Sequence, residues 1–487
     1  MTSRPVAVSD QPVPEPPHPD HRTFGLGTAT LVVVASMVGS GVLTTSGLTV
    51  YFVGSNQLML WLWLAGGVLA ICGALTIAEL ASSLPESGGD YVFLREAYGP
   101  LAAFLSGWVS FLIGFGGPIA VSASASARYF IEPWKLAEPT RSLVQHGIGT
   151  VAILLLALVH ASGRKQGAYV QVGTTLIKWT VLLLLTVFGL VAGWGNWANL
   201  QDRPPLDVNR WTAMLYSLVY VSYAYTGWNG AGYIAGEVKQ PQRLIPASIL
   251  LGTGAVMLLY LGLNLAYALA LSADDVRQLV EVPGQPVDPN RVAPIAQIVA
   301  DRLFGSTWST VLSTAIGLTL LASVSAFVLT GPRVAFAMAR AGQFPAFAGK
   351  LSAQGTPSNA TWLQAGWAIL LLWSGTLESL LSYSSVGLAL ISLLTISSVF
   401  VLRRSRPELH RPFRTPGYPL VPAIYLLGTG LLTAAAFVRS PLESSLALGS
   451  IMIGIPCYYG LVKRGPTRPA PDAVNQLGSA DQSTATH

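Results

Sequence analysis

Glycine and serine interrupt two apolar segments of this chain near their centres. Residues 36–42 read SMVGSGV, and residues 223–233 read YAYTGWNGAGY. Glycine costs about 1 kcal/mol relative to alanine inside a helix, so both segments favour a break in an otherwise continuous helix. Glycine also marks close packing between membrane helices, so a packing groove remains the alternative for the first segment taken alone.

A break inside a membrane helix has specific chemical consequences. It frees backbone N–H and C=O groups in a medium that offers them no water. Free N–H groups at the start of a half-helix suit a carboxylate, because they lie at the positive end of the helix dipole. We therefore assign the N–H groups around Gly39, Ser40 and Gly41 to a substrate carboxylate.

Free carbonyl groups at such a break suit an ammonium group. The candidates are the carbonyls near Met37, Tyr223 and Tyr225. Aromatic side chains often line ligand pockets, so Tyr223 and Trp228 are expected to close over the ligand, with ordinary packing as the alternative for Tyr223. A zwitterionic amino acid supplies a carboxylate and an ammonium a short distance apart, and it is the ligand that this arrangement predicts.

The composition indicates that these segments lie in a bilayer. Of 487 residues, 52% are hydrophobic and only 10% are charged, whereas soluble proteins carry about 25% charged residues. The mean hydropathy is +0.53. A chain with so few charges cannot cover its surface for water, so we expect an all-α membrane protein.

About twelve segments are long enough to span a membrane, which takes roughly 20 residues. They are residues 25–52, 57–83, 99–130, 143–161, 168–193, 209–235, 244–271, 306–339, 358–375, 378–402, 417–438 and 442–462. The two interrupted segments are the first and the sixth, five spans apart. Interrupted helices at matching places in two halves are the sequence sign of an inverted-repeat transporter.

This pattern predicts one transporter domain with two short tails. The domain covers residues 23–464, with one repeat at about 25–193, a second at about 209–402 and two extra helices at about 417–462; the tails, 1–22 and 465–487, are expected to be disordered and cytoplasmic. Basic residues such as Arg403 and Arg404 lie in loops on one side, and acidic residues such as Asp274 and Asp275 lie on the other. By the positive-inside rule both termini are cytoplasmic.

Four motifs resemble the amino acid–polyamine–organocation transporter superfamily, and most closely bacterial relatives of the L-type amino acid transporters. They are VGSGV at 38–42, PESGGDY at 85–91, the run from 223 to 241 containing YAYTGWN and GEVK, and RRSRPELHRP at 403–412. The resemblance covers nearly all of the chain between the tails. It implies a leucine-transporter-like fold of five plus five helices and alternating access by rocking of one helix bundle.

The resemblance also implies site residues. Backbone ligands of the family correspond to Met37, Ser40, Gly41, Tyr223 and Thr226. Tyr223 stands where the family has an aromatic gate, often phenylalanine. Thr226 replaces a glycine common in the most similar relatives, and its side chain would narrow the pocket or add a hydroxyl contact.

Lys178 lies ten residues inside the fifth span. An ionisable residue at such depth is a functional hypothesis by default, with snorkelling to the interface as the alternative. The resemblance places it where sodium-coupled relatives bind their second sodium ion, and it implies a bridge from the ammonium to the first helix and to hydroxyls of the eighth, with Ser323 and Ser325 as candidates. Sodium coupling is therefore disfavoured, while exchange and proton symport both stay open.

These observations predict sodium-independent secondary transport of neutral L-amino acids across a bacterial inner membrane. The central segments supply neither an acidic nor a basic partner for a charged substrate side chain, so a small or medium neutral substrate is predicted. The alternatives are a non-transporting sensor of the same fold and a carrier of cationic amino acids or polyamines. We find no metal-binding or phosphate-binding motif, and we expect no enzymatic activity, cofactor, metal or nucleic-acid partner. Cys72 and Cys457 both lie in apolar runs, so no disulfide-linked accessory subunit is expected.

Overall fold

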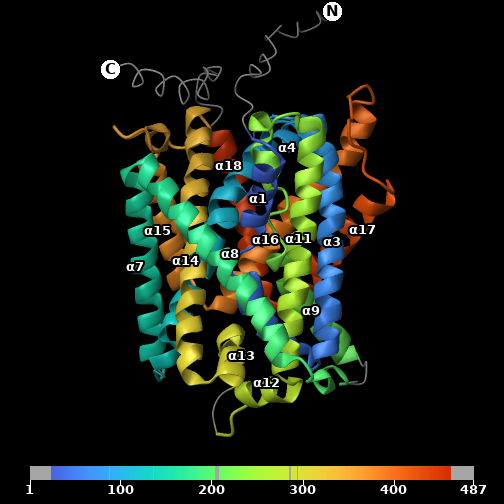
Figure 1. The fold of residues 1–487 in the computed structure, drawn as a ribbon. Helices are drawn as coiled ribbons and strands as arrows, with labels where there is room; N and C mark the ends of the chain where they lie inside the picture. Colours follow the sequence, from blue (N-terminus) through green and yellow to red (C-terminus); the bar gives the residue numbers. More distant parts are fainter. Residues whose placement is uncertain are drawn as a thin grey trace, which may run out of the picture.

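The computed structural model describes residues 24–86, 88–134, 136–202, 208–284, 287–292 and 294–461. For residues 164–172, 290, 306, 307 and 461, the backbone alone is described. The expected tails, 1–22 and 465–487, lie outside the described residues. The described chain is helical almost throughout (Figure 1).

Helices coincide with the twelve apolar segments. The first half contains α1 Leu26–Met37, α2 Gly41–Val53, α3 Asn56–Ser83, α4 Asp90–Tyr98, α5 Pro100–Val109, the π-helical turn η2 Ser110–Phe115, α6 Gly116–Ile131, α7 Thr140–Ser162 and α8 Arg164–Gly193. The second half contains α9 Val208–Ala224, α10 Gly230–Tyr233, α11 Pro241–Ala270, α12 Ala273–Val280, α13 Ile295–Phe304, α14 Ser306–Arg340, α15 Ser358–Ser374, α16 Leu377–Ser405, α17 Leu420–Arg439 and α18 Pro441–Leu461.

Within the described residues, eight helices are long and apolar enough to cross a membrane, and the pair α1 and α2, bent by 44°, makes a ninth span. The three further spans expected from the sequence coincide with α9, α15 and α18, which have 17, 17 and 21 residues. The protein is thus a multi-pass helical membrane protein with an interrupted first span. The total of twelve spans stays a prediction.

Long-range packing brings the two interrupted segments into the centre of the bundle. Helix α2 packs along α9, while α1 packs along α11 and α10. Two backbone hydrogen bonds also join the segments at one end, from the Phe24 N–H to the Glu237 carbonyl (3.0 Å) and from the Lys239 N–H to the Phe24 carbonyl (2.9 Å). The two broken helices therefore form one structural unit although they are nearly 200 residues apart in the sequence.

A buried ion pair fixes the end of α16 against α3. Glu79 is 1% exposed and accepts two hydrogen bonds from the Arg403 guanidinium, at 2.8 and 2.7 Å. The backbone N–H of Thr415 also donates to Glu79, at 2.7 Å. A buried carboxylate needs this degree of pairing, because burying an uncompensated charge is costly.

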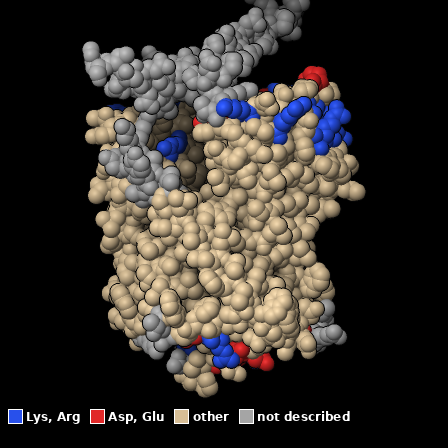
Figure 2. Space-filling model, viewed as in Figure 1, with Lys and Arg blue, Asp and Glu red and all other residues tan. Residues whose placement is uncertain are grey.

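Charged side chains gather at the two ends of the molecule. In Figure 2 lysine and arginine cluster at one end of the molecule, acidic and basic residues meet at the opposite end, and the broad face between them is uncharged. The short helices α12 and α13 lie at that opposite end (Figure 1). A wide uncharged belt is what a lipid-facing surface requires, since a charged side chain at the bilayer centre is expensive.

Candidate functional site

The two helix breaks are in direct backbone contact. Gly227 has a φ of +103°, and a Cβ at this position would lie 2.4 Å from the Ser36 carbonyl oxygen. A Cβ on Gly41 would lie 2.5 Å from the Cα of Ala224. Only glycine allows the chains to approach this closely, so the glycines read from the sequence as signs of breaks also hold the two breaks together.

The first break is short and leaves backbone donors available. Helix α1 ends at Met37 and α2 begins at Gly41. Among the described residues, the N–H groups of Ser40, Gly41 and Val42 donate no backbone hydrogen bond. A Cβ on Gly39 would meet nothing within 4 Å, so the backbone is not tightly packed at this point. The geometry matches a carboxylate site at a half-helix N-terminus.

Two carbonyl groups assigned to the ammonium already accept hydrogen bonds. The Tyr260 hydroxyl on α11 donates to the Met37 carbonyl, at 2.9 Å. The Tyr223 carbonyl accepts from both the backbone N–H and the hydroxyl of Thr226, at 3.0 and 2.7 Å. A carbonyl oxygen has two lone pairs, so Met37 retains one acceptor position, whereas Tyr223 has both engaged.

The second break is longer, and its aromatic side chains point in different directions. The Tyr223 hydroxyl interacts with that of Ser40, so this ring bridges the two breaks. The Tyr225 hydroxyl instead donates to the Trp63 carbonyl on α3, at 3.1 Å. The Trp228 ring packs edge-on against Tyr425 of α17, with ring centroids 5.8 Å apart. The structure thus brings Tyr223 to the first break and carries the side chains of Tyr225 and Trp228 away from it.

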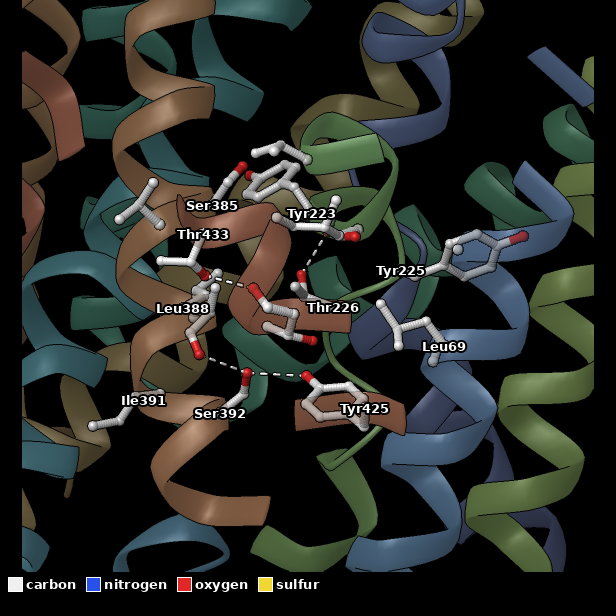
Figure 3. Close-up of a pocket in the computed structure, with 18 of the residues that line it drawn as sticks. Leu69, Tyr223, Tyr225, Thr226, Ser385, Leu388, Ile391, Ser392, Tyr425 and Thr433 are labelled. Atoms are coloured by element: carbon white, nitrogen blue, oxygen red, sulfur yellow. Dashed lines mark hydrogen bonds between the residues drawn. The ribbon is translucent and has the colours of Figure 1, made fainter. Parts of the chain in front are cut away.

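A cavity of about 100 Å³ lies beside the second break (Figure 3), and no residue of α1 or α2 lines it. Residues of α3, the break, α16 and α17 line it, including Thr226, Ser385, Ser392 and Tyr425. In Figure 3 the Tyr425 hydroxyl reaches Ser392, at 2.9 Å, while the Tyr225 ring lies apart from this cluster. Met37, Gly39, Ser40 and Gly41 do not line this cavity.

Sequence reasoning missed Asp90, which lies at the start of α4 and lines this cavity. Asp90 is 6% exposed, and one carboxylate oxygen accepts hydrogen bonds from the Asn229 amide (3.0 Å) and the Tyr233 hydroxyl (3.3 Å). Burial raises the pKa of this carboxyl from 3.8 to about 6, against the opposite effect of the two hydrogen bonds. The motif at 85–91 could have drawn attention to Asp90, but nothing in the sequence shows that this loop folds back against the second break.

Lys178 has one of the two serine partners expected for it. Its ammonium donates to the Ser323 hydroxyl on α14, at 3.2 Å, and the residue is 5% exposed. Ser325 instead bonds Nε2 of His160 on α7, at 2.8 Å. Two ionisable side chains from different helices therefore meet α14 within one turn. In the described part of the chain, no group of three or more His, Cys, Asp or Glu residues could hold a metal ion.

Comparison with known proteins decides the family. A family model described as amino acid permease matches residues 24–460, nearly the whole described chain. The chain belongs to the amino acid permease family. The resemblance read from the four motifs is confirmed, and this permease is an amino-acid transporter and not an enzyme.

Relatives along the full length of this permease are also transporters. The serine/threonine exchanger SteT of Bacillus subtilis is 29% identical over 447 residues, covering 91% of this chain and 97% of that protein. The cystine/glutamate transporter of Homo sapiens is 26% identical over 430 residues (88% and 83%). The Asc-type amino acid transporter 1 of Mus musculus is 27% identical over 445 residues (90% and 81%).

Proposed function

We propose that this permease carries neutral L-amino acids by alternating access, without sodium, through exchange or proton symport. The observation that carries the proposal is the contact between the two breaks at Gly227 and Ser36. It sets free N–H groups of the first break beside carbonyls and an aromatic ring of the second. Such a site recognises the two groups that every α-amino acid shares.

The substrate carboxylate binds the N–H groups at Gly39, Ser40 and Gly41 in this proposal. Its ammonium binds the free lone pair of the Met37 carbonyl and the carbonyl near Tyr225. Tyr223, already in contact with Ser40, closes over the ligand. Because the backbone provides most of these contacts, they bind an amino acid largely irrespective of its side chain.

Thr226 and Trp228 take a different place in the proposal. Both line the cavity behind the break, so they shape the second break from its far side. The Thr226 hydroxyl is engaged with the Tyr223 carbonyl, and this bond sets the position of the aromatic gate. A small or medium neutral side chain suits a site with no charged group at the contact between the two breaks.

Lys178 supplies the fixed cation in place of a sodium ion. Its ammonium ties α8 to α14 through Ser323, at 3.2 Å. His160 and Ser325 form a second tie, between α7 and α14, and we assign it to the support of α14. The relative SteT is a serine/threonine exchanger, which supports exchange as one of the two modes. The alternatives, a sensor without transport or a carrier of cationic amino acids or polyamines, make opposite predictions in the experiment below.

Localisation follows from the same proposal. By the positive-inside rule, the basic end in Figure 2 is the cytoplasmic one, in a bacterial inner membrane, and we propose that both termini are cytoplasmic. Cys72 is buried in α3 and Cys457 lies in α18. We therefore propose that no accessory subunit is attached through a disulfide.

The test is uptake of labelled L-alanine and L-serine by the purified full chain in proteoliposomes. We expect uptake in sodium-free buffer when the vesicles contain unlabelled amino acid or when a pH gradient is imposed. Lys178→Met should reduce it about tenfold, while the matched change Lys350→Met, at a cytoplasmic loop, should leave it unchanged. Uptake that requires sodium would overturn the role of Lys178, and absence of any uptake or exchange of neutral amino acids would overturn the proposed function.

A further inference from the structure

One end of the cavity behind the second break combines a buried carboxylate with two aromatic rings. Asp90, Trp228, Asn229 and Tyr425 all line it. The rings of Trp228 and Tyr425 contact each other edge-on, and both lie against Gly73 of α3, where a Cβ would be less than 3 Å from either ring. The aromatic wall is therefore held in a fixed position.

One oxygen of the Asp90 carboxylate accepts no hydrogen bond from the described residues. Its Oδ2 accepts the hydrogen bonds from Asn229 and Tyr233, whereas Oδ1 is buried without a hydrogen-bond partner among the described residues. The described chain places no lysine, arginine or histidine within ion-pair distance of it. A buried polar atom without a hydrogen-bond partner needs an explanation, and a ligand that binds to it would provide that explanation.

The surroundings of Asp90 narrow the chemistry of that ligand. The titratable groups that face it are the hydroxyls of Tyr233, on the segment after the break, and Tyr425, on α17. Residues that α3 and α16 contribute to the cavity, such as Leu69, Ala70 and Thr395, carry no charge. A single negative charge beside aromatic rings suits a cation, because carboxylates pair with ammonium groups and aromatic faces attract them.

We propose that this end of the cavity is a second ligand site, which binds a small primary ammonium group through Asp90 and the rings of Trp228 and Tyr425. Asp90 and Tyr425, which line this end of the cavity, take no part in the transport site proposed above, so the second site goes beyond it. Hydroxyls of Ser385, Ser392 and Thr395 can receive the polar remainder of the ligand.

The size of the cavity limits the ligand to a small molecule. Its volume of about 100 Å³ is below the roughly 150 Å³ of an engineered protein cavity that binds benzene. Ethanolamine or the smallest amino acids are therefore of suitable size, whereas an extended polyamine is not. The raised pKa of Asp90 fits the same reading, since an ammonium neighbour would supply the counter-charge that the protein itself omits.

A bound ammonium would also act on the second break. The Asn229 amide already joins Asp90 to the break, at 3.0 Å. An ammonium on Oδ1 would hold Asp90 ionised, which strengthens the hydrogen bonds that it accepts from Asn229 and Tyr233. The occupied site would therefore stiffen the segment that has to move during transport.

The test measures the thermal unfolding midpoint of the purified full chain near neutral pH with ethanolamine, glycine or ethanol, at matched chloride concentration. We expect a saturable rise of about 2 °C with ethanolamine and none with ethanol. Asp90→Asn should remove the rise. Glu86→Gln should keep it, because Glu86 carries the same charge on the same loop, pairs with Arg95 and does not line the cavity.

The outcomes separate the possible sources of the ammonium. A rise with glycine that Asp90→Asn removes assigns the site to amino acids, and a rise with ethanolamine alone assigns it to simple amines. Gly41→Ala should leave the ethanolamine effect in place even where transport is lost, so failure of the transport proposal is distinguishable. An equal rise in wild type and Asp90→Asn would overturn the second site.

A second measurement covers the case in which Asp90→Asn does not fold. Hydrogen–deuterium exchange of the wild-type peptide that contains Asp90 is measured by mass spectrometry with ethanolamine or with ethanol. Ethanolamine should slow this exchange several-fold, while ethanol should not. Equal exchange with and without ethanolamine would overturn the proposal.

Discussion

The two breaks differ in how they are built. The first spans the three residues between α1 and α2 and bends the helix by 44°. Between Ala224 and Pro241 the second contains a single α-helical turn, α10, and a short 3₁₀ turn. Tyr260 and Tyr223 contact the first break at Met37 and Ser40, whereas side chains of the second reach out to α3, α4 and α17.

This difference separates recognition from movement. A short break with free N–H groups presents a fixed set of donors, which is what binding of a carboxylate requires. A long break joined to three other helices has more ways to change shape, because each contact can be made or released separately. We therefore assign recognition mainly to the first break and opening of the site mainly to the second.

The largest effect is expected where the two breaks touch. Gly227→Ala would place a methyl group 2.4 Å from the Ser36 carbonyl oxygen in a residue with a φ of +103°. Overpacking and backbone strain together should cost on the order of 2–5 kcal/mol and abolish transport. Folded yield and uptake in proteoliposomes measure this. Gly254→Ala in α11, where a Cβ meets nothing within 4 Å, is the control; a fully active Gly227→Ala protein would show that the contact is dispensable.

A paired substitution in the first break sharpens the comparison. Gly41→Ala would drive a methyl group to 2.5 Å from Ala224 and separate the breaks, so we expect uptake to fall about tenfold or more. Gly39→Ala meets nothing within 4 Å and should fold normally, with a raised KM because its methyl group enters the ligand space. Equal KM values for Gly39→Ala and wild type would place the ligand elsewhere.

The pH dependence of stability tests the link from Asp90 to the second break. Folding raises the pKa of Asp90 from 3.8 to about 6. Its contribution to the free energy of unfolding is therefore fully present below pH 3.8 and is lost as the pH rises through about 6. The difference is on the order of 3 kcal/mol, from about 1.4 kcal/mol per pKa unit. The Asp90→Asn protein cannot ionise at this position. Its thermal unfolding midpoint should therefore rise relative to that of wild type as the pH increases from 4 to about 7. Parallel pH profiles would contradict this account.

The smallest effect is expected at the hydrogen bond between Tyr260 and the first break. Tyr260→Phe removes the hydrogen bond to the Met37 carbonyl, at 2.9 Å. The loss of about 1 kcal/mol corresponds to roughly a fivefold change in KM. Uptake kinetics measure it, with Tyr383→Phe on α16 as the control, because that hydroxyl bonds only Ser450 of α18. An unchanged KM would mean that the bond does not position the break.

The sequence was sufficient for the helices and for the position of both breaks. Apolar length identified the spans, and glycine density marked residues 36–42 and 223–233, which the structure brings together. The direction of side chains was not predictable in the same way. Tyr225 and Trp228 lie beside the break in sequence, yet in an irregular segment no helical periodicity fixes which way a side chain points.

Asp90 shows the other limit of sequence reasoning. It begins the short helix α4, outside the expected spans, and is about 140 residues from its partner Asn229. Periodicity and propensity report local structure, and neither reports that α4 folds back against α10. Ser325 is a similar case, since only the packing of α7 against α14 shows that its partner is His160 and not Lys178.

The central claim is that the two breaks together recognise the carboxylate and the ammonium of one amino acid. The most direct test is inhibition of labelled L-alanine exchange in sodium-free proteoliposomes by L-alanine, L-alaninamide and propionate. The account predicts that unlabelled L-alanine inhibits at least about tenfold more strongly than either analogue, because each lacks one of the two groups that the breaks bind. Inhibition by propionate or L-alaninamide at the same concentration as L-alanine would contradict it.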